Sequence, residues 1–495
     1  MRYPVRLLNR PCLADHTIEG RAVYPAVESL ERLAEAVAAH SPGHQVLSSR
    51  DAEFLRFLSI EPDQEGFDAL ADIALGDDGS LKASLGAIVH TPGGSLSRFR
   101  EYARVSFSEI SLPVPLSLDR ACAGEGVCFA VPAERLYEEL VPFGPSFQNA
   151  VGTVYLFNEG AVAGLQSPDF GTPGRLLGSP YVLDAAFHVA CAWGQRYHGF
   201  IAFPVGYAAR KIMYPAEAGA QYWCRVVPAG AQDVHTLLFD ILIYDAAGRL
   251  CERADGVRMK NIFQDRLQVP SWIRTDITDE FSVIRNEVPA MSVVELASIL
   301  PFSGRVLTGH ERAVGQKRFP GKTNRFVGAR IALKRLVRLL SAAAVPDDPS
   351  LIETVAADNI HPACPVDGGR QPLYCSAAHD DRFAVAVGSD RPVGVDVERI
   401  RDVLMKGAHI FMTPAERSLC AQSPLGEKQA ALRVWTTKEC AVKVSGMSLP
   451  AAWSGVELKK ISFDRSTVSI RGKMSEAVHA PVGDHLFTVL NVSEG

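Results

Sequence analysis

Two acidic side chains share one face of a short apolar strand pattern. Residues 392–398 read Pro-Val-Gly-Val-Asp-Val-Glu, so the valines face one way while Asp396 and Glu398 face the other. At ~3.3 Å per residue, the two carboxylates lie about 6.6 Å apart along the strand. Such a pair is costly unless solvent or a cation balances it, and oxygen ligands favour a hard divalent cation. The spacing therefore predicts a metal site.

A third carboxylate follows about forty residues later, in a helical pattern that ends at Gly446. Glu439 and Lys443 are four residues apart and share one face of this helix. Two interpretations are open for the pair. It forms an ordinary ion pair on a helix surface, or it serves a metal-bound phosphate whose charge needs neutralising.

A second set of polar side chains lies in the first half of the chain. His16 opens the pattern His-x3-Gly-x4-Pro, while Asp184 and His188 are four residues apart in a helical pattern. Imidazole and carboxyl groups can exchange protons with a substrate as base and acid. The alternative is a surface histidine with its hydrogen bonds satisfied and an aspartate that caps a helix.

The surrounding pattern predicts an α+β protein. Turn residues between alternating runs at 151–165 and 235–262 indicate antiparallel strands. Two long helical patterns, at 26–39 and 182–197, each precede strands, which predicts two similar halves. We expect one domain at 1–265, a linker at 266–292 with weak periodicity, and a second domain at 293–495.

The composition is that of a globular protein, with 47% hydrophobic and 22% charged residues in 495. A net charge of -5 argues against a strongly basic nucleic-acid binder. We find no apolar run of the ~18–20 residues that a membrane span needs, and no apolar signal-peptide core at the N-terminus. Ten scattered cysteines without a Cys-x-x-Cys pair favour reduced thiols, so a cytoplasmic location is expected.

The motif at His16, the segment Phe143-Gly144-Pro145-Ser146-Phe147 and the motif at Asp184 occur in an order that resembles the dehydratase domains of polyketide synthases. The resemblance covers roughly residues 5–265. It implies a double hotdog fold, in which antiparallel sheets wrap around central helices, and removal of water from a β-hydroxyacyl chain on an acyl carrier protein. It also implies that His16 is the base, Asp184 the acid, and His188 the residue that holds Asp184.

The dehydratase roles require particular protonation states. An apolar pocket favours a neutral His16, as a base must be, and burial is expected to raise the pKa of Asp184 so that it holds its proton. Two departures from the family pattern favour an alternative, a catalytically silent hotdog that only binds acyl carrier protein. Phe143 replaces the usual tyrosine, and with only 15 residues before His16 the first strand is expected to be short or absent. Hydrolysis of thioesters or hydration of enoyl chains is a third possibility.

The segments Gly-Val-Asp-Val-Glu and Trp-Thr-Thr-Lys-Glu-x3-Lys together resemble the Sfp-type 4′-phosphopantetheinyl transferases over about residues 293–495. The resemblance implies a pseudo-dimer of two α/β halves that moves phosphopantetheine from coenzyme A to a carrier serine with Mg²⁺. Asp396, Glu398 and Glu439 match the family's metal ligands. Lys443 matches the lysine near the phosphates, and Glu439, directly or through a metal-bound water, is the expected base.

Further positions match the family's coenzyme A contacts. Arg325 aligns with an arginine for the 3′-phosphate, Arg370 with a basic residue, and His379 with a histidine for the diphosphate. Glu416 matches an acid near the serine site. Arg330, Lys334 and Arg338 recur every four residues, which predicts a basic helix face that is either solvated or turned to an acidic carrier protein.

The combined expectation is a bifunctional enzyme of polyketide or fatty-acid biosynthesis, a holo-carrier synthase joined to a β-hydroxyacyl dehydratase. Both domains would share acyl carrier protein as partner, with coenzyme A as substrate, Mg²⁺ as cofactor, and neither nucleic acid nor membrane as ligand. The resemblance fits a standalone protein or a piece of a larger synthase, and it allows a homodimer.

Overall fold

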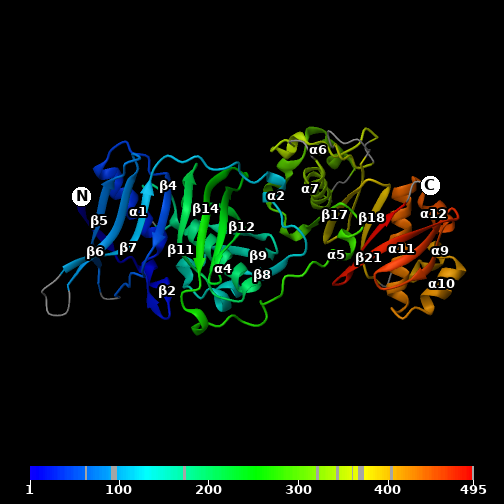
Figure 1. The fold of residues 1–495 in the computed structure, drawn as a ribbon, viewed down its shortest axis with the longest axis horizontal. Coiled ribbons are helices and arrows are strands. Elements are labelled where there is room, and N and C mark those ends of the chain that lie inside the picture. Colours follow the sequence, from blue (N-terminus) through cyan, green and yellow to red (C-terminus); the bar gives the residue numbers. More distant parts are fainter. Residues whose placement is uncertain are drawn as a thin grey trace. The chain divides into compact units, whose positions relative to one another are not determined.

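The computed structural model of the chain describes residues 1–61, 64–90, 97–170, 174–318, 321, 323–341, 345–358, 361–365, 373–401 and 405–492. These residues form two compact units (Figure 1). The first unit comprises Met1–Pro115 and Cys128–Asp276, and the second comprises Leu116–Val127 and Ile277–Gly495. The predicted domain limits at 265 and 293 stay a prediction.

The first unit is built on one antiparallel sheet, in which the described residues form twelve strands. The spatial order is β1-β5-β6-β7-β4-β11-β14-β13-β12-β10-β9-β8. The strands are β1 (Arg2–Leu8), β4 (Ser48–Phe54), β5 (Gly66–Leu75), β6 (Leu81–His90), β7 (Ser97–Phe107), β8 (Phe129–Pro132), β9 (Ala150–Phe157), β10 (Gly160–Gln166), β11 (Phe203–Ile212), β12 (Gln221–Asp233), β13 (Thr236–Asp245) and β14 (Leu250–Lys260).

Two long helices, α1 (Ala26–His40) and α4 (Pro180–His198), divide this sheet into similar halves. Helix α1 packs against β1, β5, β6 and β7, and α4 packs against β9 to β13 (Figure 1). Helix α4 is apolar on nearly all sides, and its residues 180–195 are all buried, as expected of a central helix. Each half is a hotdog, so the predicted α+β double-hotdog fold is confirmed.

One expectation about the first half is wrong. The first strand, expected to be short or absent, is the seven-residue strand β1, which pairs along its whole length with β5. The short chain before His16 suffices because the path from β1 to the histidine is only a helical turn, η1 (Pro11–Asp15). A two-stranded hairpin, β2 (Thr17–Ile18) and β3 (Arg21–Ala22), follows directly.

The second unit contains two sheets. The described strands are ordered β15-β17-β16 in one and β18-β22-β21-β20-β19 in the other. Helix α7 (Thr323–Leu340) packs on the first sheet and α11 (Glu427–Ser445) on the second, which gives the two predicted α/β halves. The strands are β15 (Ala290–Glu295), β16 (Tyr374–His379), β17 (Phe383–Ser389), β18 (Val393–Arg399), β19 (Val456–Ile461), β20 (Arg465–Ile470), β21 (Lys473–Val482) and β22 (His485–Asn491).

Shorter helices and turns complete both units. In the first unit they are α3 (Ala133–Arg135), η2 (Leu136–Leu140), η3 (Pro145–Phe147) and η4 (Gln264–Arg266). In the second unit they are α2 (Leu118–Ala121), α5 (Ser282–Arg285), η5 (Leu296–Ser298), η6 (Pro301–Val306), α6 (Gly309–Arg318), η7 (Pro349–Leu351), α9 (Ala408–Phe411), α10 (Pro414–Ala421) and α12 (Leu449–Gly455). Among the described residues, no helix is long and apolar enough to cross a membrane.

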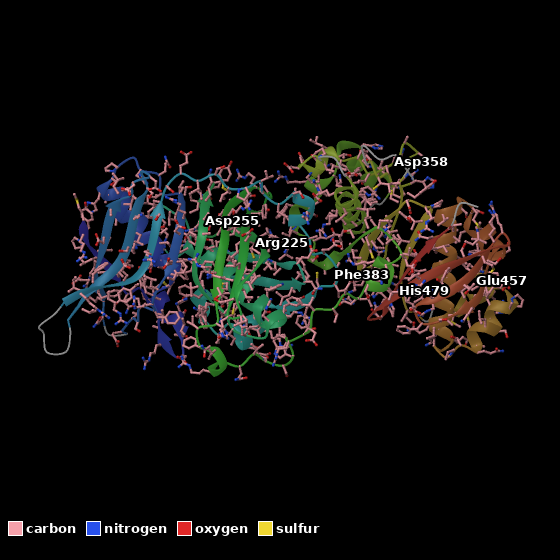
Figure 2. All side chains as sticks on the ribbon, viewed as in Figure 1. Arg225, Asp255, Asp358, Phe383, Glu457 and His479 are labelled. Atoms are coloured by element: carbon pink, nitrogen blue, oxygen red, sulfur yellow. The ribbon has the colours of Figure 1, made fainter. Side chains whose placement is uncertain are left out.

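The core of the second unit is continuous across its two sheets. Phe383 of β17 is completely buried, and its ring centroid lies 5.3 Å from that of Phe487 on β22 (Figure 2). His479 of β21 is also completely buried, and its two ring nitrogens lie 2.9 Å from Thr488 Oγ1 and 2.8 Å from Ser466 Oγ. His479 is thus a satisfied core histidine.

Residues 116–127 follow the first hotdog in the chain but pack within the second unit. Arg335 of α7 is buried and pairs with Glu125 at 2.8 Å. Its guanidinium also donates to three backbone carbonyls at 2.8–3.1 Å, those of Asp119, Ala123 and Gly124. Arg338 pairs with the completely buried Asp119 carboxylate at 3.1 Å. The loop between the two hotdogs is therefore part of the core of the second unit.

Candidate active sites

A cavity of about 670 Å³ lies in the first unit, and three of the predicted catalytic side chains line it. His16, Asp184 and His188 meet there together with Phe143, although they come from distant parts of the sequence. The walls are mainly apolar side chains, including Phe54, Leu58, Val141, Phe187, Ile201 and Phe203. The chamber thus combines an apolar interior with a few convergent polar groups, as small-molecule sites usually do.

The tautomer of His16 follows from its neighbours. Nδ1 lies 2.8 Å from the carbonyl oxygen of Val23. A carbonyl only accepts hydrogen bonds, so in the neutral ring Nδ1 carries the hydrogen and Nε2 keeps a free lone pair. Burial lowers the pKa of His16, which favours this neutral form. A neutral imidazole with a bare Nε2 is the state that a base requires.

Asp184 is the fifth residue of α4, whose N-cap is Ser179, so it does not cap the helix. Burial alone would raise the pKa of Asp184, but the imidazole of His188, with Nε2 3.1 Å from Oδ2, and that of His16 outweigh burial and lower it. The expected rise in the pKa of Asp184 is therefore wrong. That expectation counted the lost hydration and left out the two imidazoles.

Sequence reasoning missed Tyr137. Its hydroxyl accepts the backbone N–H of Ala150 at 2.7 Å and lies 3.3 Å from Nδ1 of His188. Tyr137 is buried, but it lies in a stretch rich in charged residues, Glu-Arg-Leu-Tyr-Glu-Glu at 134–139, so the sequence alone gave no sign of this role. It helps to orient His188, which in turn contacts Asp184.

The second candidate site lies between β18 and α11. Val393, Val395 and Val397 are in the core, as the alternation predicts, while Asp396 and Glu398 turn away from it. Lys443 of α11 donates to the carbonyl oxygen of Val395 at 2.7 Å and to Oδ1 of Asp396 at 3.1 Å.

The other oxygen of the same carboxylate, Oδ2 of Asp396, is buried and accepts no hydrogen bond from the described residues. The pKa values of all three predicted metal ligands are raised. Burial is the main cause, and it raises the pKa of Glu398 to about 7 with help from the nearby Asp396. Burial and Asp396 also raise the pKa of Glu439, and burial raises that of Asp396 despite Lys443. The side chains thus form an acidic cluster with too little positive charge, and such a donor set fits a divalent cation.

A second acidic group lies beside these three carboxylates. Among the described residues, the three ligand atoms found within 4.8 Å of one another belong to Asp380, Asp381 and His485 rather than to the predicted ligands. This neighbouring cluster was not recognised from the sequence, although Asp380 directly follows His379. Arg401 pairs with Asp381 at 2.7 Å, so part of its charge is already balanced.

The basic side chains predicted to bind coenzyme A are linked to the acidic cluster of β18 and α11 through Lys443, which acts on both Asp396 and His379. His379 ends β16, and its Nδ1 is buried and makes no hydrogen bond within the described part of the chain. Burial lowers the pKa of His379, and the positive charges of Arg325 and Lys443 lower it further. Arg325 and Lys443 are therefore both within electrostatic reach of His379, and the three side chains could hold phosphate groups. Arg370 lies outside the described residues.

The prediction for the basic stripe of α7 is wrong. Arg330 is buried and donates to the carbonyl oxygen of Thr354 at 2.7 Å. Lys334 is completely buried and pairs with Glu311 at 2.8 Å. These cations bind carbonyls and a carboxylate inside the unit, so they form neither a solvated face nor a surface for a carrier protein.

Glu416 also has a different environment from the one its family match implied. It is completely buried, and its carboxylate pairs with Lys438 at 2.8 Å. The same side chain accepts the backbone N–H of Leu458 at 3.0 Å and caps α10. Its observed contacts are those of a structural ion pair.

Each half of the chain matches a known protein family. The family described as the 4′-phosphopantetheinyl transferase superfamily matches residues 392–488. The family described as the polyketide synthase dehydratase N-terminal domain matches residues 129–268.

Two curated proteins are similar over parts of the chain. A hybrid PKS-NRPS synthetase, pynA of Aspergillus niger, is 27% identical over 203 residues, which is 37% of this chain and 5% of that protein. A 4′-phosphopantetheinyl transferase of Bacillus subtilis is 28% identical over 127 residues, which is 25% of this chain and 55% of that protein. The matches thus span at most about half the length of these relatives.

Solved structures with similar backbones include dehydratase domains. A trans-AT PKS dehydratase domain from Brevibacillus brevis has 16% identity and a TM-score of 0.43, and the match covers 53% of this chain and 93% of that domain. The dehydratase domain of PpsC from Mycobacterium tuberculosis has 19% identity and a TM-score of 0.40, with 52% and 92% covered. From the family matches, this chain carries a polyketide synthase dehydratase domain in its N-terminal half and a domain of the 4′-phosphopantetheinyl transferase superfamily at its C-terminus.

Proposed function

We propose that the C-terminal domain transfers 4′-phosphopantetheine from coenzyme A to a serine of an acyl carrier protein. The observation that carries this proposal is the meeting of opposite charges between β18 and α11. Three carboxyl groups, Asp396, Glu398 and Glu439, have raised pKa values, and Lys443 pairs with Asp396 at 3.1 Å. The positive charges of Lys443 and Arg325 both act on His379 and lower its pKa, which links the basic side chains to the same site. A diphosphate with a bound divalent cation has the charge pattern that complements such a site.

In the proposed reaction the serine hydroxyl attacks the β-phosphorus of coenzyme A, and 3′,5′-ADP leaves. His379 and Arg325 bind the phosphates, and Lys443 neutralises charge that builds on their oxygens. Glu439 takes the serine proton, a task for which its raised pKa is suited. Asp396, Glu398 and Glu439 would hold Mg²⁺, which when bound supplies further charge neutralisation at the phosphates.

The transfer can be tested by mass spectrometry of an apo carrier protein incubated with coenzyme A, Mg²⁺ and the full chain. We expect the carrier to gain one phosphopantetheine arm. Asp396→Ala and Glu439→Ala should each abolish the gain. Unchanged transfer by both variants would refute the assignment of the acidic cluster.

We further propose that the N-terminal domain removes water from a β-hydroxyacyl chain bound to the carrier. The bare Nε2 of His16 and the carboxyl of Asp184 line the same apolar cavity, which supports a base and an acid acting on one substrate. His16 takes the α-proton, and a protonated Asp184 gives its proton to the departing hydroxyl. Because the pKa of Asp184 is lowered, only a small fraction of molecules carries the protonated carboxyl that the reaction needs. A bound acyl chain displaces water from the cavity and so favours the neutral carboxyl.

A silent hotdog that only binds acyl carrier protein is the alternative. Phe143 favours it, since its ring lies against His16 and provides no hydroxyl. Incubation with a β-hydroxyacyl carrier decides between the two functions. Dehydration that disappears in His16→Ala supports the enzyme, whereas no loss of water with either protein leaves the binding function. Released free acid or hydrated enoyl chain in the same reaction would instead indicate hydrolysis or hydration.

A further inference from the structure

The residue before the proposed base holds the loop that carries Phe143. Oδ2 of Asp15 accepts the backbone N–H of Ser146 at 2.9 Å and its hydroxyl at 2.6 Å. The backbone of Asp15 contributes as well, because its carbonyl oxygen accepts the N–H of Gly144 at 2.8 Å. Three hydrogen bonds therefore join one residue to a loop whose Ser146 lies 131 positions away in the sequence.

Gly144 makes this close approach possible. A Cβ at this position would lie 2.4 Å from Oδ1 of Asp15 and 2.6 Å from its Cγ. These distances are far shorter than normal contacts, so a larger residue would push the loop away from Asp15. The glycine and the aspartate thus form a matched pair.

We call these three hydrogen bonds between Asp15 and residues 144 and 146 the clamp. Its consequence is seen at the imidazole of His16. The ring of Phe143 stacks on it with centroids 4.5 Å apart and planes 16° apart. Phe147, at the other end of the same loop, contacts the imidazole with a centroid distance of 4.9 Å. Both aromatic neighbours that exclude water from the base therefore depend on a loop that Asp15 holds.

We propose that Asp15 is a positioning residue for the base, because its carboxylate keeps the 143–147 loop closed over His16. The proposal rests on the proposed dehydratase function, although its main test needs no substrate. The titratable groups that face the imidazole are Asp184 and His188 of α4. Farther around the same cavity lie Glu19, Arg56 and Glu139.

Loss of the clamp should have a defined effect. When the loop lifts, water reaches the imidazole and the penalty on its charged form falls, so the pKa of His16 rises toward its ordinary value. The base is then neutral in a smaller fraction of molecules at a given pH, and it is also less well oriented. We expect kcat to fall roughly tenfold or more while KM changes less.

The experiment compares Asp15→Ala with Asp15→Asn in the full chain. Both variants remove the negative charge, but asparagine keeps an oxygen that can accept from Ser146. The pKa of His16 is measured by NMR from the ring C–H signal, assigned by its absence in His16→Ala. Asp15→Ala should raise this pKa, and Asp15→Asn should leave it close to that of the wild type.

The same variants are then assayed for dehydration as a function of pH, with transfer by the C-terminal domain as a check on the preparation. An equal pKa of His16 in all three proteins would overturn the proposal, as would equal shifts in the alanine and asparagine variants. If Asp15→Ala does not fold, Ser146→Ala, which removes one of the three hydrogen bonds, must raise the pKa of His16 for the proposal to stand. If Asp15→Ala raises the pKa of His16 but the wild type shows no dehydration, the positioning role of Asp15 stands and only the proposed dehydratase activity is refuted.

Discussion

Gly394 and Cys440 bring β18 and α11 into direct backbone contact. A Cβ on Gly394 would lie 2.3 Å from the carbonyl oxygen of Cys440, so only glycine fits at this crossing. The contact lies two residues before Asp396 and one residue after Glu439. It therefore sets how closely the carboxylates of the strand and the helix approach each other.

Replacement of this glycine should separate the two elements. In Gly394→Ala the strand must move away from the helix, and overpacking of this kind costs about 1–3 kcal/mol of stability. We expect a lower melting temperature and a loss of phosphopantetheine transfer larger than the loss of stability explains. The matched control is Gly455→Ala, because a Cβ at Gly455 would meet no atom within 4 Å. Full transfer by Gly394→Ala would show that the crossing does not position the site.

Metal affinity should depend on pH through Glu398. Its pKa is raised to about 7 by burial and by Asp396, so protons compete with a divalent ion near neutral pH. Calorimetric titration with Mg²⁺ should give tighter binding at pH 8 than at pH 6. Glu398→Gln should bind more weakly and lose most of this dependence, whereas Glu457→Gln, which alters a carboxylate paired with Lys459, should behave as the wild type. The same affinity at both pH values would contradict the assignment.

Stability without metal should show the opposite trend. A carboxyl whose pKa is raised by folding binds its proton more tightly in the folded state, so unfolding releases that proton. The contribution of Glu398 to stability should therefore fall as pH rises from about 4.5 to about 7. Thermal unfolding with a chelator present measures this trend, and added Mg²⁺ should offset the loss above pH 7.

Local patterns predicted the elements that depend on nearby residues. The helical patterns at 26–39 and 182–197 became α1 and α4, and the alternating runs at 151–165 and 235–262 became β9, β10, β13 and β14. Apolar spacing decides these elements because one face must be buried, whatever the partner. The motif residues His16 and Asp184 also meet in one cavity, as the resemblance implied.

The errors arose where distant residues determine the environment. Arg330 and Lys334 look like a basic surface in sequence, but the carbonyls and carboxylate that bury them come from other segments. The lowered pKa of Asp184 likewise requires His16, which lies far from it in the sequence. The sequence of residues 116–127 likewise contains no pattern that predicts their contact with Arg335.

The rate of dehydration should have its optimum at acidic pH. The base works when His16 is neutral, above its pKa, and the acid works when Asp184 is protonated, below its pKa. Because both pKa values are lowered, the optimum of kcat/KM should lie below about 6.5. His188→Ala removes the neighbour that opposes burial of Asp184, so the pKa of Asp184 should rise and a larger fraction of molecules should carry the protonated acid at a given pH. A rate of the wild type that still rises above pH 8 would contradict this assignment.

The second unit should depend on the loop between the two hotdogs. Arg335 is buried against the carboxylate of Glu125 and three backbone carbonyls. Arg335→Ala therefore removes the cation that balances this carboxylate, which keeps its hydrogen bonds from Ser292 and Val293, and it removes the donor to the three carbonyls. Removal of one member of a buried pair costs about 3–5 kcal/mol, which should lower the melting temperature of the second unit and reduce transfer. Lys317→Ala on α6, which changes an exposed lysine, is the control for loss of a positive charge.

A fragment of residues 277–495 should show the same defect, and adding a peptide of residues 116–127 should restore part of its stability. A fragment as stable as the full chain's second unit would show that the loop is dispensable.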